Sequence, residues 1–169
     1  MGKLARIATS AAAIMLTVSP VATGTAMADP PKINNGIRVP VTGTMRNCDH
    51  TVRGGSNFGP VPTGAGEVVF RRNGGTVTAD LQWVETGELG MRFSVGLIQT
   101  PRPLAGPCGP GSPGTAYTEM VIPDNGIANI HLESPVQQGA NGVWLKIDRP
   151  GPHSQEPAEF YSSLFIAHF

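Results

Sequence analysis

The sequence predicts an all-β protein, an antiparallel β-sandwich of about eight strands with one disulfide. Three observations predict this fold. Apolar and polar residues alternate with a period of two over several segments, which is typical of half-buried strands. Residues that form tight turns separate those segments. The only two cysteines, Cys48 and Cys108, stand far apart in the chain, in segments that read as loops.

The clearest alternation lies in the middle of the chain. In residues 76–84 every second side chain is apolar, namely Val77, Ala79, Leu81 and Trp83. In residues 91–97 the apolar positions are Met91, Phe93, Val95 and Leu97. Strands with this pattern bury one face and expose the other, as strands of antiparallel sheets do. Each segment therefore predicts a half-buried strand.

Glycine-containing turns connect these strands. Another strand is predicted over residues 67–72, and Asn73, Gly74 and Gly75 follow it. Asparagine and glycine adopt the positive φ angles that a two-residue hairpin turn needs, so a hairpin is predicted here. Residues 86–90, Thr-Gly-Glu-Leu-Gly, turn the chain again. These two turns together predict a three-strand meander.

The second half of the chain continues the pattern. Strands predicted over residues 115–122 and 127–133 flank the turn sequence Pro-Asp-Asn-Gly. Residues 143–149 alternate, with one face formed by Val143, Leu145 and Ile147 and the other by Trp144, Lys146 and Asp148. A first strand over residues 38–45 and one or two more within residues 158–169 complete the set. No linker or repeat divides residues 29–169, which are predicted to form a single domain.

The N-terminal residues predict export. Lys3 and Arg6 make a short basic segment, residues 11–21 are mostly apolar, and Ala26-Met27-Ala28 offers the small-x-small pattern that a signal peptidase accepts. The apolar stretch is too short to cross a bilayer as a helix. Residues 1–28 are therefore predicted to be a signal peptide. The expected location is secreted or extracytoplasmic, at the cell envelope; an amphipathic helix of a cytosolic protein is the alternative.

The charge balance excludes one class of partner. Lys3 and Arg6 are two of the twelve basic residues and leave with the predicted signal peptide, whereas all twelve acidic residues remain. The domain then carries a small negative net charge, so it has no electrostatic reason to bind nucleic acid. No later segment has the apolar length that a transmembrane helix requires.

The two cysteines favour a disulfide, because an even number of cysteines in an oxidising compartment is usually paired. Cys48 and Cys108 would close a loop of about 60 residues, for which the chain-entropy model gives at most about 4 kcal/mol of stabilisation. Two free thiols are the alternative. A metal site has little support, since neither cysteine belongs to a C-x-x-C spacing. The bond would join two irregular loops, residues 47–65 and residues 100–114.

The cysteine spacing departs from that of a true immunoglobulin domain. Such domains place their cysteines in strands, a tryptophan in strand C and a tyrosine two residues before the second cysteine. Here Trp83 lies far beyond Cys48, and Gly106 occupies the tyrosine position. The sandwich is therefore expected to be immunoglobulin-like or jelly-roll-like in architecture alone.

Four residues form the candidate binding patch. His131 and Glu133 share one face of a predicted strand, and Trp144 and Lys146 share one face of the next. If these two strands pair, an imidazole, a carboxylate and an indole meet on an outer surface, as in many recognition sites. The alternative is an ordinary solvated sheet face, with Trp144 covered by a loop.

Catalytic chemistry finds little support. His50, His131 and His153 could be gathered into a metal site for a metal-dependent enzyme, but no two histidines have a metal-binding spacing. No G-x-S-x-G elbow is present, and the acidic residues stand at outward strand positions or in turns. We therefore predict no catalytic residue, no metal and no cofactor.

The C-terminal residues raise one further alternative. Tyr161, Ser163, Phe165, Ala167 and Phe169 alternate as in the closing strand of an outer-membrane β-barrel. The sequence has too few aromatic residues for two girdles, and several predicted strands are too short to span a bilayer. We therefore expect a non-catalytic binding or interaction protein whose partner is a protein, a glycan or a small ligand. Loop 100–114 is the first candidate for the contacts, because loops on rigid β scaffolds usually carry recognition.

Overall fold

The computed structural model describes residues 33, 36–54, 63–151 and 157–169, and these residues contain strands and no helix. The predicted signal peptide, residues 1–28, lies outside the described residues. All strand pairs are antiparallel. The strands are β1 (Ile37–Thr42), β2 (Ala65–Asn73), β3 (Thr76–Val84), β4 (Arg92–Thr100), β5 (Thr115–Val121), β6 (Ile127–Pro135), β7 (Gly142–Arg149), β8 (Glu159–Ser163) and β9 (Ala167–His168). The predicted all-β antiparallel fold is confirmed.

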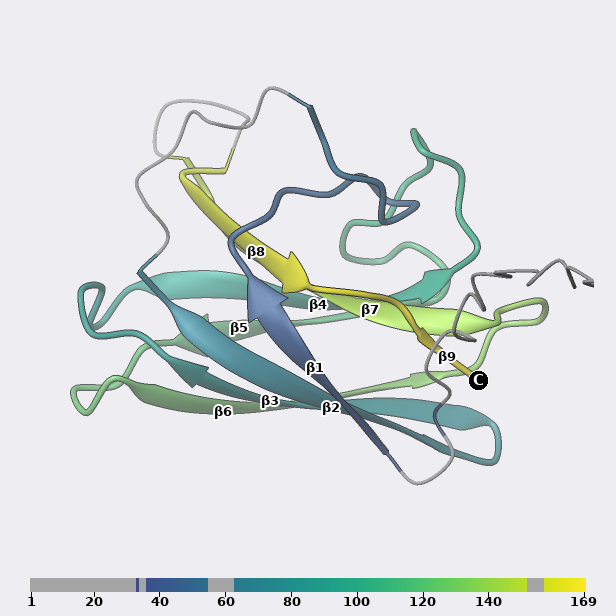
Figure 1. The fold of residues 1–169 in the computed structure, drawn as a ribbon, viewed down its shortest axis with the longest axis horizontal. Coiled ribbons are helices and arrows are strands. Elements are labelled where there is room, and N and C mark those ends of the chain that lie inside the picture. The colour runs from purple at the N-terminus through teal and green to yellow at the C-terminus, as the bar shows by residue number, and fades with distance from the viewer. Residues whose placement is uncertain (1–32, 34–35, 55–62, 152–156) are drawn as a thin grey trace, which may run out of the picture.

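Hydrogen bonds join eight strands into one continuous sheet, in the order β5-β4-β7-β8-β1-β2-β3-β6, and β9 adds to β7. The sheet curls into two layers that face each other (Figure 1). On one side the layers are connected through β1 and β8, which share only the pairs Val41 with Ser163 and Thr42 with Ser162. The result is a nearly closed, barrel-like sheet, whereas a sandwich in the strict sense has two separate sheets.

The other side of the sheet is an open seam between β5 and β6. These two strands lie close together and are consecutive in the chain. Neither is hydrogen-bonded to the other, since β5 pairs with β4 and β6 pairs with β3. The seam is therefore the place where the sheet stops short of closure.

The interior is formed by the alternate apolar side chains of both layers. The alternating apolar residues predicted in β3, β4 and β7 are buried, with one exception. Met91 precedes β4 and is 44 % exposed, so its predicted inward position was wrong. The physical reason is that Met91 belongs to the connection before the strand, where the period of two does not apply.

The predicted hairpin around Gly74 is confirmed. Gly74 and Gly75 form the turn between β2 and β3, and Asn73 pairs directly with Thr76. Gly74 has a φ of +58°, which glycine adopts without the strain that a Cβ atom would cause.

The predicted three-strand meander was wrong. β3 pairs with β2 and β6, whereas β4 pairs with β5 and β7, so residues 85–91 cross from one layer to the other. Residues 122–126 make a second crossing beside the first. The Glu85 N–H donates to the Gly126 carbonyl at 2.8 Å, and the Gly90 N–H donates to the Ile122 carbonyl at 2.8 Å. Alternation shows which face of a strand is buried, but it does not identify the neighbouring strand.

Candidate functional site

The two loops that carry the cysteines meet over the outer face of β7 and β8. Cys48 and Cys108 form a disulfide with their Cα atoms 5.6 Å apart, as predicted. Figure 1 shows the loop after β1 and the loop after β4 above the layer that contains β4 and β7. Between them lies a concavity of about 290 Å³, lined by both cysteines, by Trp144 and Lys146 of β7, and by residues of β8. We call it the loop concavity.

Trp144 lines the loop concavity and lies beside Ile98 on the outer face of the sheet. The two residues are paired across β7 and β4 and are both fully buried, at 1 % and 0 % exposure. Neither belongs to the main core between the layers. They are therefore a small apolar pair on the outer face of the sheet, and His50 of the first loop packs on Trp144.

His50 is the part of the first loop that contacts Trp144. Its ring lies 5.2 Å from the indole at an interplanar angle of 64°, an edge-to-face contact. Its Nε2 lies 3.0 Å from the Ser163 carbonyl oxygen. Burial lowers the pKa of His50, which favours the neutral ring that donates through Nε2. With a φ of +70°, His50 adopts a conformation that side-chain-bearing residues rarely take.

Arg46 fastens the same loop to the end of β8. Its Nε donates to Ser162 Oγ at 3.1 Å, its Nη1 to the His50 carbonyl at 3.0 Å, and its Nη2 to the Leu164 carbonyl at 3.2 Å. All three acceptors are neutral oxygen atoms. Burial lowers the pKa of Arg46, but a guanidinium keeps its charge at any physiological pH.

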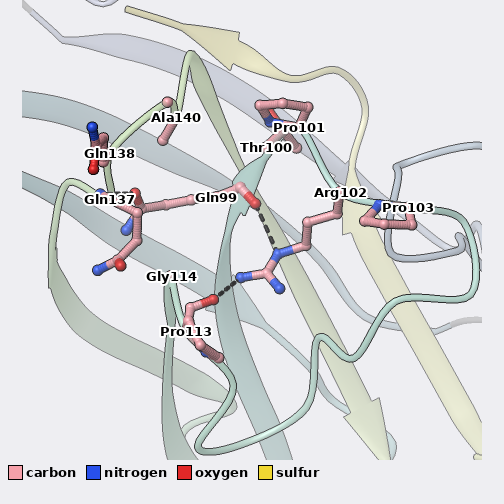
Figure 2. A pocket seen from close by; sticks show the side chains of 11 residues that line it. Gln99, Thr100, Pro101, Arg102, Pro103, Pro113, Gly114, Gln137, Gln138 and Ala140 are labelled. Atoms are coloured by element: carbon pink, nitrogen blue, oxygen red, sulfur yellow. Dashed lines mark hydrogen bonds between the residues drawn. The ribbon is translucent and has the colours of Figure 1, made fainter.

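Arg102 gives the second loop its shape. Figure 2 shows its guanidinium between the carbonyl oxygens of Gln99 and Pro113, and it also donates to the Pro107 carbonyl at 2.7 Å. The Tyr117 hydroxyl donates to the Cys108 carbonyl at 2.5 Å, which fixes the loop beside the disulfide. Sequence reasoning did not find these anchors, because a backbone carbonyl leaves no residue-type signal.

The hollow drawn in Figure 2, of about 440 Å³, is larger than the loop concavity. Two of its polar side chains, Gln99 and Arg102, already have partners within the fold. The Gln99 amide donates to Ser134 Oγ at 2.9 Å and to the Pro135 carbonyl at 2.8 Å, and its oxygen accepts from the Gln137 N–H at 2.8 Å. Gln99 uses both ends of its amide within the fold, and Arg102 is the one cationic side chain among the described lining residues, so we do not assign a ligand to this hollow.

The charged side chains that line the loop concavity have one sign. Among its described lining residues, Arg46, Arg53 and Lys146 are cationic, and no carboxylate is present. One acid lies close by, since Asp148 Oδ1 is 3.0 Å from the Lys146 ammonium nitrogen. The concavity therefore favours anionic over cationic ligands.

The structure separates the four predicted patch residues into two pairs. β6, which carries His131 and Glu133, pairs with β3, whereas β7, which carries Trp144 and Lys146, pairs with β4, β8 and β9. The patch required that β6 and β7 pair, and they do not, because residues 136–141 carry the chain from one layer to the other. Trp144 is buried beneath a loop, the alternative arrangement considered for it.

His131 lies on the exposed outer face of β6. Its Nδ1 is 2.6 Å from Asp80 Oδ1 on β3, and Arg71 of β2 binds the other oxygen of that carboxylate. All three side chains are about half exposed. Glu133 is exposed on the same face. This arrangement is a solvated cross-strand charge network, which contributes little to stability.

The histidines do not gather into the metal site considered above. His50 and His131 lie on different layers, with separate partners, and His153 lies outside the described residues. Within the described ranges, no group of three or more His, Cys, Asp or Glu side chains is placed to hold a metal ion.

Two buried carboxylates, Glu85 and Glu159, are bound within the fold. Glu85 accepts hydrogen bonds from Thr63 Oγ1 at 3.0 Å and from the Gly87 N–H at 2.9 Å, so it holds the crossing after β3. Glu159 accepts from the Tyr161 hydroxyl, whose pKa burial raises. These bonds explain both acids as structural groups.

Comparison with protein-family models, with curated proteins and with solved structures finds no match to this chain. In the part of the chain that the structure describes, no helix has the length and apolar character needed to cross a membrane. The case for a function therefore depends on the geometry of the loop concavity.

Proposed function

We propose that this protein is a secreted or extracytoplasmic, non-catalytic binding protein whose ligand occupies the loop concavity. One observation carries the proposal: two loops distant in sequence are joined by a disulfide over an indole floor and enclose a cavity with three cationic side chains. Loops held on a rigid β scaffold are the usual carriers of recognition. The cavity size fits a small ligand or one side chain or sugar of a larger partner.

Support for the location comes from two independent features. The first is the N-terminal pattern of basic residues, apolar run and Ala-Met-Ala cleavage motif. The second is the disulfide itself, because disulfides persist mainly outside the reducing cytosol. Expression of the full chain with export and mass spectrometry of the recovered protein tests this part. A mature N-terminus at Asp29 is expected, and an uncleaved chain that remains in the cytosol contradicts it.

The binding part is tested with the oxidised protein and a library of small acids, amines, sugars and neutral aromatics. Two-dimensional NMR of backbone amides and indole N–H groups reports where each compound binds. We expect the compounds that bind to shift signals of Trp144, Lys146 and the two loops. Binding that is confined to the His131 and Glu133 face, or absent for the entire library, contradicts the proposal.

A matched pair of variants separates specific from general binding. Ala105 is exposed and lines the loop concavity, whereas Gln138 is exposed and lines the hollow of Figure 2. Ala105→Trp introduces a bulky ring into the concavity, so it is expected to abolish the shifts at Trp144. Gln138→Trp adds the same ring elsewhere and is expected to leave them unchanged.

A further inference from the structure

We infer that the ligand of the loop concavity is a small amphipathic acid, bound through its carboxylate. This inference rests on the proposed function and specifies its ligand class. Three features of the concavity point to it: a surplus of hydrogen-bond donors, a surplus of positive charge, and apolar walls of limited extent.

The donor surplus begins with Arg46. A guanidinium has five N–H groups, and Arg46 uses one on each of its three nitrogens for neutral oxygen atoms. One N–H on each Nη atom remains for another acceptor, and a carboxylate can bind such a pair bidentately. No carboxylate of the described residues fills this role.

Arg46 differs in this respect from the arginines on the strand faces. Four of those arginines, Arg38, Arg71, Arg92 and Arg149, form an ion pair with a carboxylate of a neighbouring segment. Their charges are balanced within the fold. Arg46 is half-buried, and its hydrogen-bond partners among the described residues are all neutral, so a bound anion would supply a negative charge that these residues do not.

Trp144 adds a second unused donor. Its Nε1–H is buried and has no acceptor, although the same indole lines the loop concavity. A buried donor without a partner carries a desolvation cost that an incoming acceptor removes. Arg46 and Trp144 therefore both have N–H groups for which the described residues supply no acceptor oxygen.

Lys146 adds a second positive charge to the wall of the concavity. Asp148 offsets part of the charge of Lys146, at 3.0 Å, but it does not line the cavity. A cation entering the concavity would meet Arg46 and Lys146 and no carboxylate on the described walls. The described walls therefore favour an anion over a cation.

The remaining walls set the size and polarity of the rest of the ligand. Met45, Leu104 and Phe160 give the concavity an apolar side. A volume of about 290 Å³ corresponds to about ten water molecules at the density of the liquid. A carboxylate attached to one ring or a short alkyl chain matches both constraints.

The test uses phenylacetate and its neutral counterpart phenylacetamide, which have the same shape and number of non-hydrogen atoms. NMR titration of the oxidised full protein measures both dissociation constants. We expect phenylacetate to bind with a constant on the order of 1 mM. We expect phenylacetamide to bind at least about tenfold more weakly, since a charge-assisted hydrogen bond is lost.

The two tryptophans provide an internal reference in the same spectrum. Both Trp83 and Trp144 have a buried Nε1–H without a partner, but only Trp144 lines the loop concavity. Phenylacetate is expected to shift the Trp144 indole signal and to leave that of Trp83 in place. Equal shifts of both signals would indicate a general change in the protein and would overturn the inference.

Variants of two surface cations complete the test. Lys146→Gln removes a charge from the concavity and is expected to weaken phenylacetate binding at least about threefold, and more strongly at low salt. Arg38→Gln removes a charge from the opposite layer and is expected to change it by less than twofold. Equal effects of the two variants would overturn the inference, since only net charge would then matter.

The outcomes also distinguish this inference from the proposed function. If phenylacetamide binds at Trp144 within threefold of phenylacetate, the carboxylate has no role, and the concavity remains a binding site of another specificity. The same conclusion holds if only amines or neutral sugars of the library shift Trp144. If no compound of any class does so, both the inference and the proposed function fail.

Discussion

The two tryptophans of this protein are buried to the same extent in different ways. Trp83 lies between the layers of the sheet, with its ring centroid 4.5 Å from that of Tyr161 at an interplanar angle of 73°. Trp144 lies on the outer face of β7 beneath His50 and the two joined loops. Both are at most 1 % exposed, and each has an indole N–H without an acceptor.

The comparison shows that a side chain can be buried by its own position on a strand or by loops from distant parts of the sequence. Trp83 is buried because it occupies an inward position of a strand in a two-layer fold, and its neighbours along β3 share that position. Trp144 occupies an outward position, so its strand alone would leave it in water. Only the covering loops, fastened by Cys48 and Cys108, remove it from solvent.

Replacement of each ring by alanine is the strongest way to break the comparison. Trp83→Ala is expected to lower the free energy of unfolding by about 3–5 kcal/mol, because a rigid interior leaves a cavity. Trp144→Ala is expected to cost roughly half as much, since the loops above it can settle into the space. Urea denaturation followed by circular dichroism measures both losses.

Equal losses would show that the loops are as rigid as the sheet layers. If Trp83→Ala does not fold, Trp83→Phe and Trp144→Phe allow the same comparison with smaller losses in the free energy of unfolding. The order of the two losses is expected to stay the same.

Removal of the disulfide is expected to affect the environment of Trp144 and not that of Trp83. The double variant Cys48→Ser with Cys108→Ser is expected to lose up to about 4 kcal/mol of stability. The fluorescence of Trp144, read in a Trp83→Phe background, should move to longer wavelength and become accessible to iodide. The fluorescence of Trp83, read in a Trp144→Phe background, should not change. Parallel changes in both backgrounds would mean that the bond supports the whole sheet.

Substitutions of His50 sharpen the comparison at the loop itself. His50→Ala removes the ring contact with Trp144 and keeps an alanine at a positive φ angle, so a loss of about 1–2 kcal/mol is expected. His50→Gly removes the same contact but adopts that angle freely. The glycine variant is therefore expected to be more stable than the alanine variant by about 1 kcal/mol. Thermal unfolding of both variants measures the difference, and the opposite order would show that backbone strain at this residue is negligible.

The smallest expected effect is a dependence on pH. Burial is the main cause that lowers the pKa of His50, and the nearby Arg46 charge acts in the same direction. Between this lowered value and the ordinary value of about 6.5, the unfolded chain binds more protons than the folded protein. Stability should therefore fall as the pH drops below about 6.5, by less than about 1 kcal/mol. His50→Asn, which tolerates the same φ angle, should remove this part of the slope, and an unchanged slope would contradict the assignment.

The strand faces could be predicted from the sequence because burial along a strand follows from neighbouring residues. Alternation correctly separated Leu145 from Trp144 on β7 and Leu132 from His131 on β6. Strand pairing could not be predicted in this way. The sequence of residues 85–91 is compatible with a hairpin, yet this segment crosses between the layers. Its hydrogen bonds to the second crossing, residues 122–126, come from a distant part of the chain, which local sequence does not reveal.

The candidate site was only half predictable. Trp144, Lys146 and the disulfide were identified from residue types, and the loops were identified from glycine and proline. Arg46 and His50 were missed as site residues, because their roles come from carbonyl oxygens of β8 and of the loop itself. The one available signal was position: His50 stands two residues after Cys48, so it has to lie near the disulfide.

The open seam between β5 and β6 has a consequence for the behaviour of many copies of this protein. An edge strand presents unpaired N–H and C=O groups, and such edges can recruit a strand of another molecule and start aggregation. Here the two edges of the sheet face each other and are tied by the short link of residues 122–126. Each edge strand occupies the space that a strand of another molecule would need beside the other edge. Although β5 and β6 are not hydrogen-bonded to each other, their position therefore protects both edges against aggregation.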